Sequence, residues 1–145
     1  MIGRKIIEAV NVILSIDDAI DSQQSDYAAY KKDGSYDESK LKFLDGKKPT
    51  RFRLKQWTRR QRNDFVDNAG TSASIDLALR YTLVHVDNYM LDDAVLAITE
   101  DDFDSSPVHG RILKQEWLDK ANMTIAVRRE LFEHIHAVGE LSLPL

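Results

Sequence analysis

The chain of 145 residues contains no cysteine. It can therefore form no disulfide framework, no thiolate zinc site and no cysteine nucleophile. This composition fits an intracellular or virion setting best, although a lack of cysteine excludes no compartment. The sequence also lacks the run of roughly 18 apolar residues that a membrane span requires. Glu8 and Asn11 interrupt the apolar N-terminal segment, and no small-residue cleavage site follows it, so we expect a soluble protein.

Motifs of known catalytic chemistry are absent as well. The sequence has no glycine-rich phosphate loop, no G-x-S-x-G nucleophile motif and no H-E-x-x-H helix. His134 and His136 would point about 200° apart on a helix, so they could not share a metal ion there. His85 and His109 have no second ligand at a suitable interval. We therefore predict that the protein is not an enzyme and binds no metal or cofactor.

The basic side chains, by contrast, are concentrated in one stretch. Residues 47–62 hold eight of the 20 Lys and Arg residues and none of the 24 Asp and Glu residues. Because the formal net charge of the whole chain is −4, the remainder of the chain is strongly acidic. Such segregation within one small chain suggests contact with a charged partner, either nucleic acid or another copy of the chain.

Residues 1–38 are expected to form an N-terminal helix and a polar linker, which together could act as an arm. Apolar residues recur at near-helical spacing at Ile2, Ile6, Val10, Ile13 and Ile20. The sequence "VNVILSI" within this segment would also suit a strand. Residues 21–39 are polar and contain the turn signal "KKDGS". Residues 39–145 would then form a hairpin and a helical body.

The expected hairpin covers residues 40–55. Leu41 and Phe43 alternate with lysines, and "DG" at residues 45–46 supplies a turn. Phe52 and Leu54 then alternate with further basic residues. If both strands form, one face of the hairpin is apolar and the other is basic. The basic face would comprise Lys40, Lys42, Arg51, Arg53 and Lys55.

Helices are expected in the rest of the chain. Thr58 and Gln61 have the spacing of a capping box, which predicts that a helix begins after Thr58. A helix capped by Ser72 or Ser74 would then run to about residue 91, with its apolar positions at Ile75, Leu79, Leu83, Val86 and Met90. A helical turn at residues 94–98, a short helix around Trp117 and a long helix over residues 124–140 would follow. We therefore expect a mainly α fold, a helical domain with one small β-hairpin, at the margin of α+β.

Arginines at the start of a helix need an explanation. Arg59 and Arg60 would lie in the first turn, where the helix dipole disfavours positive charge, and Arg62 extends the set. The cost falls if a carboxylate or a phosphate lies close by. The acids could come from the same chain, at residues 92–93 and 100–104, or from a neighbouring subunit. A nucleic-acid backbone is the third source, with Phe52 and Trp57 interleaved among the charges, although the acidity of the whole chain disfavours it.

Three runs carry a resemblance to a known class of protein. "LKFLDGKKPTRFRLKQWTRRQ", "ALRYTLVHVDNY" and "RRELFEHIHAVGELSLPL" together resemble the arrangement in small morphogenesis proteins of tailed bacteriophages. These include tail-assembly chaperones and minor virion structural proteins, in which a hairpin precedes a helical body. The resemblance covers about residues 37–145, depends on the order and texture of the segments, and transfers no functional residue. It implies a non-enzymatic assembly role with many protein contacts.

We therefore expect a structural or assembly protein of a tailed-phage-like particle, located in the virion or the host cytoplasm. It would bind other copies of itself or other virion proteins, and the apolar segments at both ends would supply most of the binding free energy. The basic residues would meet carboxylates on a neighbour, such as Asp92, Asp93, Asp101 and Asp102. Two alternatives are a nucleic-acid-binding module that uses residues 47–62 and a phage-encoded inhibitor of a host protein.

Overall fold

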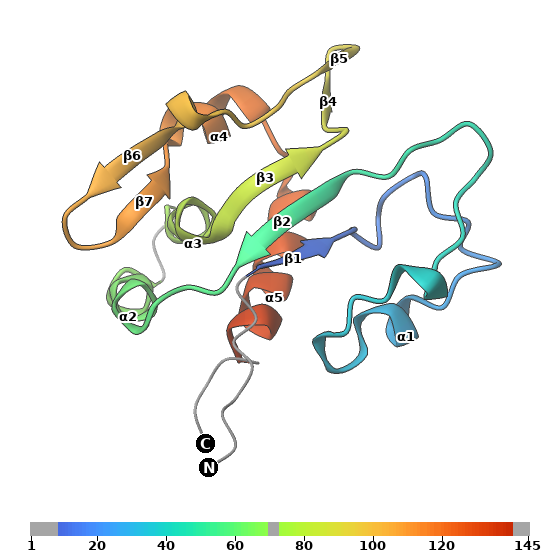
Figure 1. Ribbon diagram of the computed structural model, residues 1–145, viewed down its shortest axis with the longest axis horizontal. Helices are drawn as coiled ribbons and strands as arrows, with labels where there is room; N and C mark the ends of the chain where they lie inside the picture. The colour runs from blue at the N-terminus through green and yellow to red at the C-terminus, as the bar shows by residue number, and fades with distance from the viewer. Residues whose placement is uncertain (1–8, 70–72, 141–145) are drawn as a thin grey trace.

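The computed structural model of the chain describes residues 9–69 and 73–140 (Figure 1). Within these residues it contains five α-helices, one three-stranded antiparallel sheet and two two-stranded antiparallel sheets. The elements are β1 (Ala9–Val12), α1 (Tyr27–Lys31), β2 (Arg51–Lys55), α2 (Arg59–Asp67), α3 (Ser74–Thr82), β3 (Leu83–Asp87), β4 (Met90–Leu91), β5 (Ala94–Val95), β6 (Phe103–Ser106), β7 (Gly110–Leu113), α4 (Gln115–Ala121) and α5 (Ile125–Glu140). Three short 3-10 helices are η1 (Lys32–Gly34), η2 (Glu38–Lys40) and η3 (Glu100–Asp102). The prediction of a mainly α fold is therefore wrong, because the chain is an α+β mixture.

The sheet β1–β2–β3 forms the centre of the fold, and α5 lies behind it (Figure 1). Both neighbours of β2 are antiparallel, with Val12 opposite Phe52 and Phe52 opposite Val86. These apolar residues are buried together with Leu131 and Ile135 of α5. The core therefore lies between one face of the sheet and the apolar side of the last helix.

The predicted N-terminal helix is wrong over its described part. Residues 9–12 form the edge strand β1, and the alternative suggested by "VNVILSI" is the one that the structure adopts. Val10 and Val12 are β-branched, and the strand finds a partner in β2, which lies 40 residues further along the chain. A pattern of apolar residues contains no information about such a distant partner. Residues 1–8 and the tail "LSLPL" lie outside the described residues.

The polar segment 21–39 forms α1 and η1 and packs on the edge of the sheet. Tyr30 is fully buried, and its hydroxyl accepts a hydrogen bond from the backbone N of Ile13 at 2.9 Å. The hydroxyl of Tyr27 donates to the backbone O of Ile13 at 2.6 Å. These bonds satisfy backbone groups just beyond the last residue of β1, on the edge that faces away from β2. The use of residues 1–38 as an arm stays a prediction, although Val12, Tyr30 and Tyr36 belong to the same core as the rest of the chain.

The second strand of the hairpin predicted at residues 40–55 is confirmed as β2, with Phe52 and Leu54 buried, but the hairpin itself is wrong. Leu41 and Phe43 do not pair with β2, because β1 and β3 occupy both edges of that strand. Phe43 instead makes an isolated bridge with Ile20. The "DG" turn does form, with Gly46 at φ +76°, but it belongs to a loop that leads into the sheet. The two-stranded pairing that does occur after residue 100, between β6 and β7, was missed.

The helix predicted from residue 74 to about residue 91 ends at Thr82, and the chain continues directly as β3. Leu83 and Val86 are both buried although they lie three residues apart. A register shift in the pairing of β2 with β3 explains this spacing, because Leu54 lies opposite Leu83 while Arg53 lies opposite His85. The bulge brings both side chains to the same face, so two buried residues of a strand stand three positions apart, as they would on a helix. The first residue before α3 is Ala73, which makes no side-chain cap, and Ser72 lies outside the described residues.

The predicted helices around Trp117 and over residues 124–140 are confirmed, whereas the predicted helical turn at residues 94–98 is wrong. α4 includes Trp117, and α5 covers the predicted range with Leu131, Ile135 and Val138 buried. Residues 94–98 do not form a helical turn, because Ala94 and Val95 form β5, which pairs with β4. The helix that begins after Thr58 is also confirmed and is described below.

Candidate interaction surface

Helix α2 places three arginines in solvent at one end of the molecule. The capping box predicted for Thr58 is present, because its hydroxyl accepts from Gln61 N while Gln61 Oε1 accepts from Thr58 N. Gln61 and Phe65 are buried and fix which side of the helix faces the core. Successive side chains on a helix turn by about 100°, so Arg59 and Val66 point away from the core and Arg62 lies on the flank beside them. We call Arg59, Arg60, Arg62 and Val66 the α2 surface.

The α2 surface combines unpaired positive charge with exposed apolar area. Arg59, Arg60 and Arg62 are exposed, and none of them forms an ion pair within residues 9–69 and 73–140. The first turn of α2 contains no acidic residue that could offset the helix dipole. Each exposed cation there costs about 0.3–1 kcal/mol. Val66 is 58% exposed, which is high for a valine.

Two further cations lie beside the start of α2. Lys55 ends β2 and is half-buried, and its pKa is lowered by burial and by the charge of Arg111. Arg111 on β7 pairs with Glu100 at 2.6 Å and lies over the ring of Phe103 at 3.9 Å from its centroid. Lys55 and Arg111 therefore add to the cations at the start of α2, while Asp64, Asp67 and Asp104 are the acids of α2 and β6.

The other predicted basic residues do not join the α2 surface. Arg51 forms a two-fold contact with Glu38, in which Nη2 lies 2.7 Å from Oε1 and Nε lies 3.0 Å from Oε2. This contact raises the pKa of Arg51, and it satisfies the guanidinium within the chain. Arg53 lies on the exposed face of β2 and reaches Asn11 Oδ1 at 3.5 Å. Lys40 and Lys42 are exposed in and after η2, which packs beside α1 (Figure 1).

Phe52 and Trp57 are core residues. Phe52 is 3% exposed and Trp57 is 8% exposed, so neither offers a face on which a nucleobase could stack. Trp57 packs on Phe65 of α2, with 5.3 Å between the ring centroids, and on Gly139 of α5. A Cβ atom at Gly139 would lie 2.8 Å from Trp57 Nε1, so a glycine is needed for this close approach. The two aromatic side chains hold β2 and α2 against the last helix.

The predicted acidic partners lie in two places. Asp92 and Asp93 form the tip of the β4–β5 hairpin, where both adopt positive φ angles of 50° and 64° and both are exposed. Asp101 is exposed in η3, whereas Asp102 Oδ2 accepts from Thr99 N at 2.7 Å and caps η3. The β4–β5 hairpin lies at the top of Figure 1 and α2 lies at the lower left, so the two are well separated. Asp92 and Asp93 therefore do not neutralise the arginines of α2 in the same chain.

A second group of polar residues surrounds His134 on α5, beside a pocket of about 330 Å³. Glu130 accepts hydrogen bonds from Ser15 N at 2.5 Å and from Ser15 Oγ at 2.7 Å. His134 Nε2 lies 3.2 Å from Glu130 Oε2, and His134 Nδ1 lies 2.9 Å from the hydroxyl of Tyr36. Since Nε2 faces a carboxylate it carries a proton, and in the neutral ring Nδ1 accepts from Tyr36. We call Ser15, Tyr27, Tyr36, Glu130 and His134 the His134 cluster.

The pKa shifts indicate which groups of the His134 cluster are charged at neutral pH. Burial alone would raise the pKa of Glu130, but hydrogen bonds from His134 and Ser15 outweigh it and lower the pKa to about 2. Burial raises the pKa of Tyr36 to about 12, and burial together with Glu130 raises the pKa of Tyr27 further still. At neutral pH both phenols are protonated and Glu130 is ionised, and each of these groups has a partner within the chain. The cluster is therefore a hydrogen-bonded junction between α5 and residues 15–36.

Sequence reasoning missed this cluster because its members are spread over residues 15–134. The only local signal is the spacing of Glu130 and His134, which stand one helical turn apart. The described residues contain no group of three or more His, Asp or Glu side chains that could hold a metal ion. No helix in the described part of the chain is long and apolar enough to cross a membrane. No family model, no curated protein and no solved structure matches the chain.

Proposed function

We propose that the chain is a non-enzymatic structural or assembly protein that works by binding other copies of itself through the α2 surface. The observation that carries this proposal is the set of three exposed arginines in α2 that have no acidic partner in the described chain. Acids on a second molecule would remove the cost of placing these charges at a helix N-terminus. Asp92 and Asp93 are exposed and form no ion pair with residues 9–69 or 73–140, so they are available to another copy.

The kind of particle comes from the resemblance to tailed-phage morphogenesis proteins. Under this proposal the protein acts in a tailed-phage-like assembly, in the virion or in the host cytoplasm. The α2 surface and the β4–β5 tip are separate surfaces of one chain, so contacts between them would run head to tail. Such contacts form rings or filaments, which are the forms that tail and shell components adopt.

A protein partner suits the α2 surface better than nucleic acid. A phosphate backbone is bound by cations that are free of nearby acids, whereas α2 also carries the exposed Asp67. Phe52 and Trp57, the aromatic residues of the basic stretch, are buried. Val66 adds an apolar contact of the kind that the centre of a protein interface contains.

Native mass spectrometry of the purified chain across a range of concentrations tests this proposal. We expect the native chain to form dimers and larger species, and we expect Arg59→Glu with Arg62→Glu to weaken the association about tenfold or more. The matched control is Lys32→Glu with Lys120→Glu, which changes the net charge equally at two exposed lysines outside the α2 surface. A native chain that stays monomeric at high concentration contradicts the proposal, and a strong complex with added DNA at low salt favours the nucleic-acid alternative.

A further inference from the structure

A groove of about 240 Å³ lies at the end of the central sheet that is remote from α2. Its apolar lining comes from Leu14, Ile16, Phe52, Tyr89 and Val127. Leu14 and Phe52 are buried, whereas Ile16 is 52% exposed beside the opening. The volume of the groove exceeds that of several methylene groups, so the groove can hold one aliphatic side chain.

The rim of this groove is acidic. Asp17 is fixed in place because its two carboxylate oxygens accept from Ala19 N at 2.9 Å and from Thr50 N at 2.8 Å. The side chain of Asp18 is 88% exposed and lies 3.6 Å from Lys47 Nζ. An exposed ion pair of this kind contributes little, so Asp18 is available to a better partner. The groove therefore suits an apolar side chain that has a cation beside it.

The α2 surface presents this combination of side chains. Arg59, Arg62 and Val66 fall within an arc of about 60° when successive residues turn by 100°. Arg62 precedes Val66 by about one turn, so its guanidinium lies on the same strip as the exposed valine. Arginine binds a carboxylate through a planar fork of donors, which the ammonium of Lys47 lacks.

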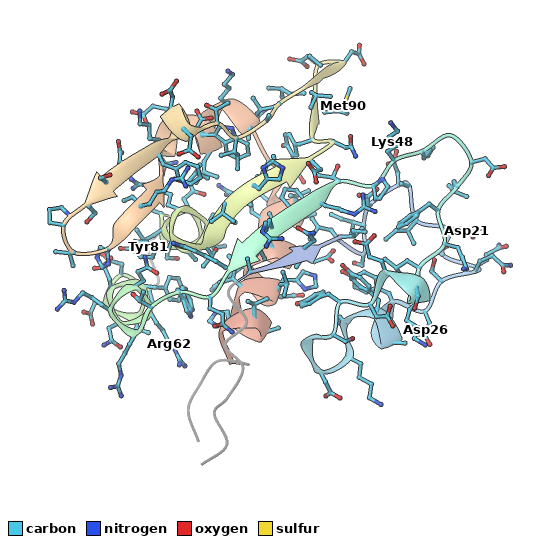
Figure 2. The ribbon with its side chains drawn as sticks, in the orientation of Figure 1. Asp21, Asp26, Lys48, Arg62, Tyr81 and Met90 are labelled. Carbon is cyan, nitrogen blue, oxygen red and sulfur yellow. The ribbon has the colours of Figure 1, made fainter. Side chains whose placement is uncertain are left out.

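One chain cannot place its own Val66 in its own groove. Thr50 and Phe52 bring the groove to the start of β2, whereas α2 follows the end of that strand. Five extended residues span about 17 Å, and the strand holds the two sites apart. Figure 2 shows the same separation, because Arg62 lies at the lower left, Met90 at the top and Lys48 to the right of centre. A Val66 side chain that fills the groove must therefore come from a second molecule.

We propose that Val66 of one copy enters the groove of the next copy, where Arg62 pairs with Asp18. This inference rests on the proposed self-association and names the surface that receives α2. Lys47 and Lys48 are exposed and precede Thr50 of the groove by only a few residues. Both repel the approaching arginines, so the attraction of Asp17 and Asp18 must exceed this repulsion. The contact joins two different surfaces, and each copy therefore keeps a free groove or a free α2 for another neighbour.

Two variants test the α2 surface and the groove separately. Val66→Asp disables α2 and leaves the groove intact, whereas Ile16→Glu disables the groove and leaves α2 intact. Both side chains are more than half exposed, so both variants should fold, and thermal unfolding followed by circular dichroism checks this. We expect each variant alone to associate about tenfold or more weakly than the native chain. An equal mixture should form a heterodimer in native mass spectrometry and no larger species, because each heterodimer keeps only disabled ends.

The outcomes distinguish this inference from the proposed function. If Ile16→Glu associates as the native chain does while Arg59→Glu with Arg62→Glu does not, the groove is not the receptor, although the α2 surface still mediates self-association. A mixture of the two variants that stays monomeric overturns the head-to-tail contact. The charge exchange of Arg62→Asp with Asp18→Arg should restore association that each single change weakens, and a double variant as weak as the single ones overturns the pairing. A native chain that is monomeric throughout overturns both proposals.

Discussion

At the scale of single residues, Glu130 shows how a buried charge can stabilise a fold. Its side chain is 12% exposed and accepts hydrogen bonds from residues that are distant in sequence. A buried carboxylate is costly unless its lone pairs are satisfied, and here two donors come from Ser15 and a third from His134. The lowered pKa of Glu130 records that the charged form is favoured in the folded state.

We predict that Glu130→Gln lowers the free energy of unfolding by about 1–3 kcal/mol at neutral pH. The amide has only one acceptor oxygen and would turn donors toward Ser15 N or His134 Nε2, which leaves buried donors unsatisfied. Urea unfolding of the native chain and the variant measures the difference. Glu133→Gln is the control, because Glu133 is an exposed neighbour on the same helix. Equal stability of the native chain and Glu130→Gln would show that the junction contributes nothing.

The same residue predicts a dependence of stability on pH. The pKa of Glu130 is lower in the folded state, at about 2, than the ordinary value of 4.5, so its stabilisation is complete above pH 4.5 and is lost as the pH falls toward 2. We therefore expect the stability difference between the native chain and Glu130→Gln to shrink over this range. Unfolding by urea at a series of pH values measures it. A difference that stays constant down to pH 2 would contradict the lowered pKa.

At the scale of elements, helices with local signals and the alternating strand β2 were predictable, whereas the pairing partners of the strands were not. α2 begins at a capping box, and α5 carries an apolar strip over four turns, so both could be found from neighbouring residues alone. β1, β2 and β3 are joined by contacts between residues about 30 to 45 positions apart. The stability of a strand comes from such partners, and the bulge in β3 even gave Leu83 and Val86 a helical spacing.

The element α1 gives a prediction about the edge of the sheet. Tyr30→Phe keeps the buried ring but removes the hydroxyl that accepts from Ile13 N at 2.9 Å. The backbone N–H of Ile13 is then buried without a partner, which costs about 1–3 kcal/mol. We expect lower stability and faster hydrogen exchange at the Ile13 amide. Tyr89→Phe, which removes the bond from the Tyr89 hydroxyl to Ala121 O, should leave that amide unchanged.

At the scale of the whole molecule, the arginines of α2 and several exposed or groove-lining acids belong to different surfaces. Asp17 and Asp18 line the groove beside Thr50 and Phe52, and Asp92 and Asp93 form the β4–β5 tip. The α2 surface of one molecule can therefore face acids on a different surface of its neighbour. This arrangement suits association between copies better than neutralisation within one copy.

We predict that self-association weakens moderately as salt is added. Exposed charges are screened over about 10 Å at 0.1 M ionic strength, whereas the contact of Val66 with an apolar groove is not. The dissociation constant measured by sedimentation velocity should rise about three- to tenfold between low and high salt. Association that strengthens with salt would show that the charges do not contribute to the contact.

The basic stretch and its outcome illustrate the limit of sequence reasoning. Its eight cations were evident from the sequence, but the structure divides them: Arg51 pairs with Glu38, Lys47 lies near Asp18, and α2 carries three arginines without acidic partners. The two aromatic residues of the stretch, Phe52 and Trp57, are buried in the hydrophobic core. Which cation meets which carboxylate depends on distances in space, and a charge pattern does not contain them.

The sequence by itself determined the composition, the concentration of basic residues and the helices α2, α4 and α5, because each depends on residues within a few turns of one another. The tertiary structure alone decided that residues 9–12 form a strand, that residues 21–39 cover a sheet edge, and that five residues from Ser15 to His134 meet in one cluster. These outcomes depend on pairing between distant segments, whose free energy exists only when the chain has closed the loops between them.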